Sequence, residues 1–397
     1  MIAKVYQSKI GGKIGAIVSK SYAHRIAICN FLAGNEPTSN SGEFISNDIS
    51  VTQTCLEVAR KGERVLNCGE SGSTLRFLIP LMAVLGGEYT FKGEGRLMQR
   101  PNEQLFKVLN EHGVSASQTD CVRISGKLTS GDFRIAGDIS SQYVSGLLMA
   151  LPKLEGNSKI ILTTPLSSKP YVDITIQVLK QFNVEIEQTE YGFFIKGNQK
   201  YKGDMKPEGD WSNSAFFLVA GALSNGVEVS GLNLKSCQGD KAIIDILKRA
   251  GAHVEVDNDK VKVSSASLSK FTFDFNHCPD LVPIACVLAS FCDGTSVLKN
   301  IKRLTLKESD RVETCIKMLG AFNVKATTDG ENLYVEGGKV ERGVIDSFND
   351  HRIAMSSAVL AVNACGESTI TNAQAVNKSY PTFFKHLALV GGRVDVV

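Results

Sequence analysis

The sequence predicts an α/β protein of two domains, each built from three small units of the same kind. Three observations favour this fold class. The chain has 397 residues, more than one hydrophobic core usually supports. A pattern of an amphipathic helix, then Gly or Asn, then alternating β-type residues recurs along it. A polar segment with Gly and Pro, residues 204–210, follows the third unit and predicts the boundary between domains.

The recurring pattern places a residue that tolerates left-handed backbone geometry between a helix and a strand. Its copies are a weak one at 58–63 and clearer ones at 109–114, 179–184, 247–252, 319–324 and 387–392. The turn residues are Gly62, Gly113, Asn183, Gly251, Asn323 and Gly391, separated by 51, 70, 68, 72 and 68 residues. All steps but the first are close to one sixth of the chain. This spacing predicts six units whose period is too long for a common solenoid.

Composition excludes several function classes. The net charge of +3 is too small to indicate nucleic acid or membrane as a partner. The ten cysteines include no CxxC pair and no zinc-like grouping with His, which favours reduced, mostly buried thiols. No signal-peptide core or bilayer-length apolar run is present, so we expect a soluble cytoplasmic protein. The motifs of nucleophile elbows, zincins, Walker loops and complete dinucleotide sites are missing, so no metal or organic cofactor is expected.

Seven segments carry small hydroxylated, glycine or charged residues at the entry to an apolar helix. They are residues 19–25, 68–76, 96–101, 140–143, 167–171, 307–311 and 349–352. A helix start offers free N–H groups and a positive dipole to an anion. Each segment alone is explained by helix capping and needs no ligand. Seven of them in a repeated chain predict an anion-attracting cleft, provided that each unit points its helix starts inward.

The segment from Asn349 to Arg352 is the most informative of the seven. It places an acid, an imidazole and a guanidinium directly before the apolar run 353–362, and Asp350 is a good N-cap. A second charged cluster, residues 307–311, stands about forty residues upstream, again before a helix-like segment. Together the two clusters indicate a site for a small, multiply charged substrate.

Taken together, these segments resemble the 5-enolpyruvylshikimate-3-phosphate (EPSP) synthase family from about Ser19 to Pro381. The matching motifs are Ser19-Lys20-Ser21…Arg25, Gly72-Ser73…Arg76, Arg100-Pro101, Ser140-Ser141-Gln142, Ser168-Lys169-Pro170-Tyr171, Glu208-Gly209-Asp210, Pro279-Asp280, residues 307–311, residues 349–352 and Lys378-Ser379-Tyr380-Pro381. The resemblance implies a two-domain inside-out α/β barrel with six βαβαββ-type units, three per domain. We expect residues 1–18 and 209–397 to form one domain, residues 19–208 the other, and the active site to occupy the cleft between them.

The resemblance also implies an activity. The enolpyruvyl group of phosphoenolpyruvate would be transferred to the 5-hydroxyl of shikimate-3-phosphate with release of phosphate, on the pathway to chorismate and the aromatic amino acids. The reaction is addition and then elimination through a tetrahedral ketal, so protons must move both ways. Asp280 is expected to be the base, and Glu308 and Lys20 to move a proton on and off the methylene carbon. The expected partners are these small molecules alone, bound by a monomer.

The binding residues implied by the resemblance form two overlapping sets. Those for shikimate-3-phosphate are Lys20, Ser21, Arg25, Ser140, Ser141, Gln142, Ser168, Tyr171, Asp280, Arg303 and Lys307. Those for phosphoenolpyruvate are Lys20, Gly72, Arg100, Gln142, Arg311, Arg352 and Lys378. Arginine suits both substrates, because its planar fork binds carboxylate and phosphate oxygens in pairs.

Departures from the family pattern occur at four places. Glu70 stands where many relatives have Asn, and Ile17-Val18 replaces the usual Pro-Gly. His24 occupies a position often held by Asn, and Arg303 one where some relatives have Asn. None of these changes removes a charge-bearing residue of the pattern.

Three alternatives compete with this interpretation. The sister enzyme, UDP-N-acetylglucosamine enolpyruvyl transferase, typically carries a reactive loop cysteine, and residues 96–101 contain none. A catalytically inactive, phosphate-binding paralogue would be expected to lose Asp280, Glu308 or Lys20, and all three are present. A scaffold of six units with capped helices does not account for so many matched motifs.

Overall fold

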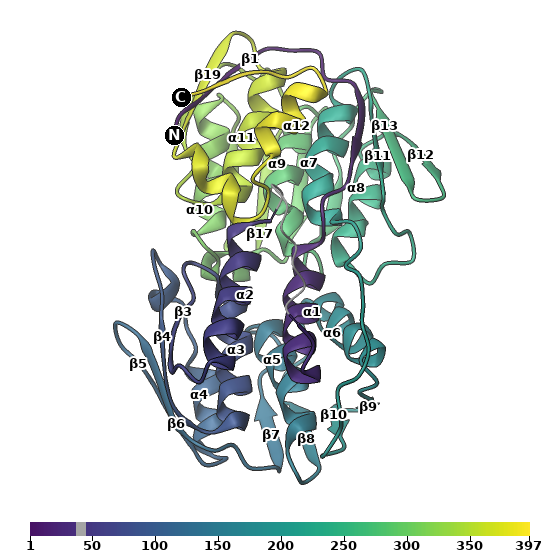
Figure 1. Ribbon diagram of the computed structural model, residues 1–397. Helices are drawn as coiled ribbons and strands as arrows, with labels where there is room; N and C mark the ends of the chain where they lie inside the picture. The colour runs from purple at the N-terminus through teal and green to yellow at the C-terminus, as the bar shows by residue number, and fades with distance from the viewer. Residues whose placement is uncertain (37–44) are drawn as a thin grey trace. The chain divides into compact units, whose positions relative to one another are not determined.

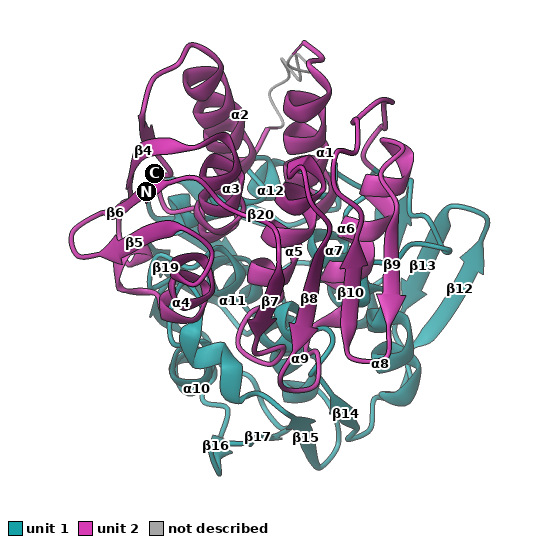
Figure 2. Cartoon of the chain, turned by 90° about the horizontal axis from the view of Figure 1, so that it is seen from below, with its two compact units in different colours: residues 1–19, 208–397 teal, residues 20–207 magenta. Residues whose placement is uncertain are grey.

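A computed structural model describes residues 1–36 and 45–397 of the chain (Figure 1). The chain divides into two compact units, coloured separately in Figure 2. Unit 1 comprises residues 1–19 and 208–397, and unit 2 comprises residues 20–207. These bounds differ by one residue at each junction from the domain bounds written from the sequence. The second junction lies inside the polar segment 204–210.

The described residues form five four-stranded sheets with one shared topology. In each sheet the first strand of the repeat unit pairs parallel with the second, the second pairs antiparallel with the fourth, and the fourth pairs antiparallel with the third. In the sheet β3-β4-β6-β5, for example, β3 is parallel to β4, and β6 is antiparallel to both β4 and β5. The same order in five places is the structural form of the repeat.

Unit 2 holds two of these sheets, each in the order βαβαββ. The first repeat is β3 (Val65–Asn67), α3 (Gly72–Leu85), β4 (Gly87–Lys92), α4 (Glu103–Asn110), β5 (Val114–Gln118) and β6 (Val122–Gly126). The second is β7 (Asp132–Ile135), α5 (Ser141–Ala150), β8 (Ser158–Leu162), α6 (Lys169–Gln181), β9 (Ile186–Thr189) and β10 (Gly192–Ile195), whose strands lie side by side in Figure 2. Before them, α1 (Lys20–Ala33) and α2 (Asn47–Arg60) represent the weak first copy, and residues 37–44 between these helices lie outside the described part.

Unit 1 holds three sheets, and the strands near the N-terminus complete two of them. The elements are β2 (Gly12–Gly15), α7 (Trp211–Ala222), β11 (Val227–Ser230), α8 (Ile243–Arg249), β12 (His253–Asp257) and β13 (Lys260–Ser264). The next repeat is β14 (Thr272–Asp274), α9 (Val282–Ser290), β15 (Thr295–Lys299), α10 (Arg311–Ala321), β16 (Ala326–Thr328) and β17 (Asn332–Glu336). The last is β18 (Val344–Asp346), α11 (His351–Asn363), β19 (Glu367–Thr371), α12 (Phe383–Leu389), β20 (Arg393–Val396) and β1 (Ala3–Tyr6).

The first helix of each repeat is the core of its unit. Every residue of α7 and α9 is buried, and α7, α9 and α11 pack against one another in unit 1, as α3 and α5 do in unit 2. A helix that is apolar on all sides must be covered on all sides. The outer strands β9, β12 and β20 are largely exposed, so helices lie inside and sheets outside, which confirms the inside-out fold. Although these helices are apolar, none in the described part of the chain is long and apolar enough to cross a membrane.

The six turn residues predicted from the sequence all have the left-handed geometry that the pattern requires. Their φ angles are 82° at Gly62, 87° at Gly113, 56° at Asn183, 91° at Gly251, 62° at Asn323 and 97° at Gly391. Only Gly and, less readily, Asn adopt such angles at low cost. The prediction of six helix–turn–strand joints is therefore confirmed.

Candidate active site

The residues singled out from the sequence gather in two clusters, one in each unit. We call Asp280, Lys307, Glu308, Arg311, Asp350 and Arg352 the unit 1 cluster. We call Lys20, Arg25, Arg76, Arg100 and Gln142 the unit 2 cluster. Most of these side chains belong to the first turn of a helix or to the residues just before it, as the seven charged segments predicted.

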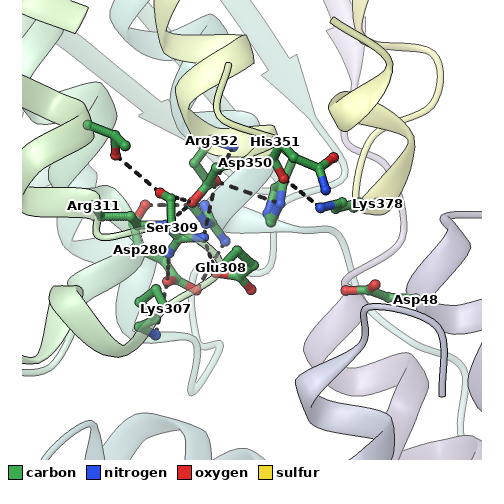
Figure 3. A network of polar contacts seen from close by, with 12 residues as sticks. Asp48, Asp280, Lys307, Glu308, Ser309, Arg311, Asp350, His351, Arg352 and Lys378 are labelled. Atoms are coloured by element: carbon green, nitrogen blue, oxygen red, sulfur yellow. Dashed lines mark hydrogen bonds and ion pairs between the residues drawn. The ribbon is translucent and has the colours of Figure 1, made fainter. Parts of the chain in front are cut away.

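Arg311, the first residue of α10, is the centre of the unit 1 cluster (Figure 3). Its side chain is 1% exposed and bonds three carboxylates. Nε donates to Asp350 Oδ2 at 2.8 Å, Nη1 to Asp280 Oδ1 at 2.8 Å and Nη2 to Glu308 Oε2 at 2.6 Å. Burial alone would lower the pKa of Arg311, but the three carboxylates raise it well above its usual value. The guanidinium is therefore held permanently charged.

Asp280 receives three cations. It lies in the short helix η4 (Pro279–Leu281), and its carboxylate is 3.3 Å from Lys307 Nζ, 2.8 Å from Arg311 Nη1 and 3.1 Å from Arg352 Nη2. Arg352 also donates to the carbonyl of Asp280 at 3.2 Å. Such charge-assisted bonds fix the orientation of the carboxylate.

Asp350 combines two functions. It is the N-cap of α11, as predicted, and accepts from the backbone N–H of Arg352 at 2.9 Å. The same buried carboxylate accepts from Arg311 and, at 3.0 Å, from the hydroxyl of Ser309. These bonds connect the two charged segments of the sequence, which are neighbours only because the fold packs α10 and α11 together.

Three predicted cations of unit 1, Lys307 of the cluster and two others, remain to be placed. Lys307 is half-buried; desolvation, assisted by the Arg311 charge, lowers its pKa although Asp280 opposes this. Lys378 is buried and donates to the carbonyl of Asn349 at 2.5 Å. Arg303 donates to the carbonyl of Asn276 at 3.0 Å. Asn349 and Lys378 thus join two motifs that are 29 residues apart.

Asp240 is a buried carboxylate that the sequence analysis missed. It lies in the short helix η3 (Gly239–Ala242) and is 4% exposed. Burial, and then the neighbouring charge of Asp280, raise its pKa to about 6, while Arg352 opposes the shift. Perturbed carboxylates gather at functional sites, and here two acids share the field of Arg352.

Replacing Asp240 by Asn should make stability less dependent on pH. The folded state holds the proton of Asp240 more tightly than the unfolded chain does, because the pKa rises to about 6. The stability that Asp240 contributes is therefore complete at pH values below its pKa in the unfolded chain, about 3.9. It is lost as the pH rises through the folded pKa of about 6. As the pH rises from about 4 to about 8, the free energy of unfolding of the variant should increase by roughly 3 kcal/mol relative to that of the unsubstituted protein. Urea unfolding at both pH values measures this, and an equal difference at both would contradict it.

Arg25 dominates the unit 2 cluster, because it is a buried cation whose bonds are all to neutral groups. It is 3% exposed, lies over the ring of Phe77, and donates to Thr175 Oγ1 at 2.6 Å and to the carbonyls of Ser21 and Tyr171 at 2.7 and 2.9 Å. No carboxylate of the described residues forms an ion pair with it. Burial lowers its pKa to about 10. A bound anion would offset the cost of this uncompensated charge.

Arg100 is a second cation of this kind. It is 8% exposed, its Nε has no hydrogen-bond partner among the described residues, and no described carboxylate pairs with it. Its guanidinium lies against Gly72, the first residue of α3: a Cβ built on Gly72 would be 2.3 Å from Nη1. Gly72 therefore leaves the space in which Arg100 lies beside a helix start.

Gln142 connects α3 with α5. Its carboxamide accepts from Arg76 Nη1 at 2.8 Å and donates to Ser73 Oγ at 2.9 Å. Ser140 is the N-cap of α5, followed by Ser141 at the first helical position. Arg76 belongs to a motif recognised in the sequence but was not proposed as a site residue.

The remaining predicted residues of unit 2 lie at two further helix starts. Ser168 is the N-cap of α6 with a φ of 53°, and Tyr171 lies in the first turn of the same helix. Lys20 begins α1 and bonds Asp48 Oδ2 at 2.7 Å, both side chains being largely buried. Asp48 was missed, because nothing in the sequence pairs residue 48 with the α1 motif.

Comparison with known proteins identifies a family that fits this arrangement. A family model described as EPSP synthase (3-phosphoshikimate 1-carboxyvinyltransferase) matches residues 46–387. The chain is 40% identical over 430 residues to a Clostridium novyi (strain NT) protein named 3-phosphoshikimate 1-carboxyvinyltransferase, with 99% of this chain and 98% of that protein covered. A Clostridioides difficile (strain 630) protein of the same name is 36% identical over 429 residues, again with 99% and 98% covered.

Solved structures show the same fold. An EPSP synthase from Acinetobacter baumannii superimposes with a TM-score of 0.79 at 22% identity, covering 100% of both chains. The enolpyruvyl transferase NikO from Streptomyces tendae gives a TM-score of 0.77 at 16% identity, covering 99% of this chain and 98% of that one. At such low identity these two likenesses concern the fold alone.

Proposed function

Because the chain belongs to the EPSP synthase family, its activity is that of a 3-phosphoshikimate 1-carboxyvinyltransferase of the shikimate pathway, and we propose that the two clusters described above carry it. The observation that supports this assignment most strongly is the contrast between the clusters. In unit 1, Lys307, Arg311 and Arg352 are balanced by Asp280, Glu308 and Asp350. In unit 2, Arg25 and Arg100 are buried without a carboxylate partner among the described residues.

The unbalanced cations of unit 2 suit the substrates. Shikimate-3-phosphate and phosphoenolpyruvate each carry a phosphate and a carboxylate, so four anionic groups must be bound. We propose that Arg25, with Ser21 and Tyr171 beside it, binds shikimate-3-phosphate. Arg100, which lies beside the first turn of α3, would bind phosphoenolpyruvate. Its guanidinium and the free N–H groups of that turn would contact the same anion.

The balanced unit 1 cluster suits proton transfer. Asp280 has the geometry of a base: a carboxylate oriented by three cations, with its side chain 17% exposed. Glu308 is bonded to Arg311, and its side chain is 22% exposed, so substrate can reach both acids. We propose that Asp280 removes the proton of the attacking hydroxyl and that Glu308, with Lys20, serves the methylene carbon.

The remaining predicted residues complete the proposed binding sets. Arg352, Lys378 and Arg311 would serve phosphoenolpyruvate, and Arg311 would do so while holding its three carboxylates. Lys307 and Arg303 would serve shikimate-3-phosphate. Ser140, Ser141, Gln142 and Ser168 would contact the phosphate region, where helix N-termini supply N–H donors.

Phosphate release tests the proposed function. Phosphoenolpyruvate with shikimate-3-phosphate should release phosphate, and either substrate alone should not. UDP-N-acetylglucosamine as acceptor tests the sister activity, which the family match does not favour. Arg100→Ala and Arg352→Ala should both impair the reaction, one from each unit. Binding of both substrates without turnover would support the inactive paralogue instead.

Gly72→Ala should weaken phosphoenolpyruvate binding with little loss of stability. The new Cβ would lie 2.3 Å from Arg100 Nη1 and 2.8 Å from Cζ, so the guanidinium must move. We expect the KM for phosphoenolpyruvate to rise about tenfold, as for loss of a charge-assisted hydrogen bond. Gly320→Ala is the matched control, because Gly320 also lies in a helix and its Cβ would meet nothing within 4 Å. An unchanged KM in Gly72→Ala would contradict the position proposed for the donor.

A further inference from the structure

Four buried side chains form a hydrogen-bonded chain that none of the proposed binding roles uses. The chain runs from His24 on α1 through Thr52 on α2 to Thr74 and Ser71 at the start of α3. His24 Nδ1 is 2.7 Å from Thr52 Oγ1, Thr52 Oγ1 is 2.5 Å from Thr74 Oγ1, and Thr74 Oγ1 is 2.7 Å from Ser71 Oγ. None of the four residues is more than 1% exposed. Polar groups buried so deeply must satisfy one another.

The protons in this chain have one consistent direction. Thr74 donates its hydroxyl proton to Ser71, so the 2.5 Å contact between Thr52 and Thr74 needs Thr52 as the donor. The carbonyl of Asp48, 3.2 Å from Thr52 Oγ1, is a second and longer acceptor for the same proton. A hydroxyl has one proton, and Thr52 must therefore accept from His24. This places the proton of the imidazole on Nδ1 and leaves Nε2 as a bare lone pair.

The surroundings of His24 agree with a neutral ring in that tautomer. Nε2 has no hydrogen-bond partner among the described residues, which is tolerable for a lone pair and costly for an N–H. Burial, and then the charges of Lys20 and Arg25, lower the pKa of His24 well below its ordinary value. The ring also packs edge-on against Phe77. His24 is thus a fixed donor rather than a titrating group.

The chain ends on the residue that caps α3. Ser71 Oγ accepts the backbone N–H of Thr74 at 3.2 Å as well as the Thr74 hydroxyl, and is thereby the N-cap. The next residue, Gly72, is the one against which Arg100 lies, and Ser73 is bonded to Gln142. At the other end, His24 lies between Lys20 and Arg25 on α1. The chain therefore links the helix start that carries Lys20 to the helix start beside Arg100.

We propose that His24 and Thr52 are positioning residues that orient the first turn of α3 for the donor substrate. This inference rests on the proposed function, since it assumes that Gly72 and Arg100 meet phosphoenolpyruvate. The physical reason is that a rotating Ser71 hydroxyl caps a helix loosely, whereas a Ser71 oxygen that accepts two bonds is fixed. A change in the orientation of the first turn of α3 would displace both its N–H groups and its contact with Arg100.

Thr52→Val against Thr52→Ser tests the proposal. Val keeps the shape and removes the hydroxyl, leaving His24 Nδ1–H and Thr74 without their partner, whereas Ser keeps the hydroxyl. We expect Thr52→Val to raise the KM for phosphoenolpyruvate about tenfold, and to leave shikimate-3-phosphate affinity unchanged, with kcat nearly preserved at saturation. Thr52→Ser should recover most of the loss. A lower melting temperature with an unchanged KM, measured well below melting, would overturn the proposal by showing a merely structural role.

Two further measurements test the proposal independently of the folding of Thr52→Val and of the activity assay. If Thr52→Val does not fold, His24→Leu against His24→Asn repeats the comparison, because Asn supplies an N–H donor near the position of Nδ1. Nitrogen NMR of the His24 ring needs no activity. It should show a protonated Nδ1 and a bare Nε2, and an Nε2–H tautomer would overturn the inference. Should the unsubstituted protein release no phosphate, the proposed function fails, while the ring tautomer still decides whether the chain is ordered as described.

Discussion

Asp280→Asn and Glu308→Gln should each lower the turnover rate by about 10²–10⁴-fold while the protein stays folded. An amide keeps the shape of the acid and removes its ability to take or give a proton. Asp280→Asn should also weaken shikimate-3-phosphate binding modestly, because the carboxylate is proposed to accept a hydrogen bond from the substrate hydroxyl. Glu308→Gln should leave that affinity nearly unchanged. Single-turnover rates, binding and melting temperature are measured on the same samples.

The Glu308 variant decides between a catalytic and a purely structural interpretation of this residue. Glu308 is bonded to Arg311 three residues later at 2.6 Å, so it is also an ion pair at a helix start. A purely structural ion pair predicts a lower melting temperature with near-normal turnover, which would remove Glu308 from the catalytic residues. Glu313→Gln is the control: Glu313 pairs with Lys317 at 2.6 Å on the same helix, but both side chains are more than half exposed. It should change neither rate nor stability appreciably.

The fold was predictable from local signals to the extent that each repeat carries its own. Gly113, Asn183, Gly251, Asn323 and Gly391 mark the joints because the backbone there needs a positive φ, which few residue types tolerate. The pairing within each sheet was not readable in this way. The sheet β18-β19-β1-β20 takes β1 from the other end of the sequence, and register between such distant segments depends on packing.

The candidate site was predictable where its residues stand together in short motifs. Asp350, His351 and Arg352 are consecutive, and the N-cap function of Asp350 followed from its place before an apolar run. Its bond to Arg311 joins residues 39 apart and became visible only in the fold. Asp240 and Asp48 were missed for the same reason, because a lone carboxylate in the sequence reveals neither its burial nor its partner.

Arg311→Met should destabilise the protein by about 3–5 kcal/mol, the typical cost of leaving buried charges without their partner. The Arg311 side chain is 1% exposed, and its loss would leave the carboxylates of Asp280, Glu308 and Asp350 close together. Asp350 is fully buried, and its carboxylate should be destabilised most, since its other hydrogen bonds are to Ser309 and the helix N-terminus. Urea unfolding measures the loss, and Lys317→Met, which removes a half-exposed cation from the same helix, should cost less than about 1 kcal/mol.

The pH dependence of this loss distinguishes charge from packing. Without Arg311, the three carboxylates repel one another, so the folded state takes up protons more readily than the unfolded chain. The folded pKa values then rise, and the loss of stability is full at neutral pH and shrinks as pH falls toward about 4. Adding Asp350→Asn to Arg311→Met should recover part of the loss at neutral pH, because one of the repelling charges is gone. A loss that is the same at both pH values, and is not reduced by Asp350→Asn, would mean that Arg311 stabilises unit 1 through its packing and not through its three ion pairs.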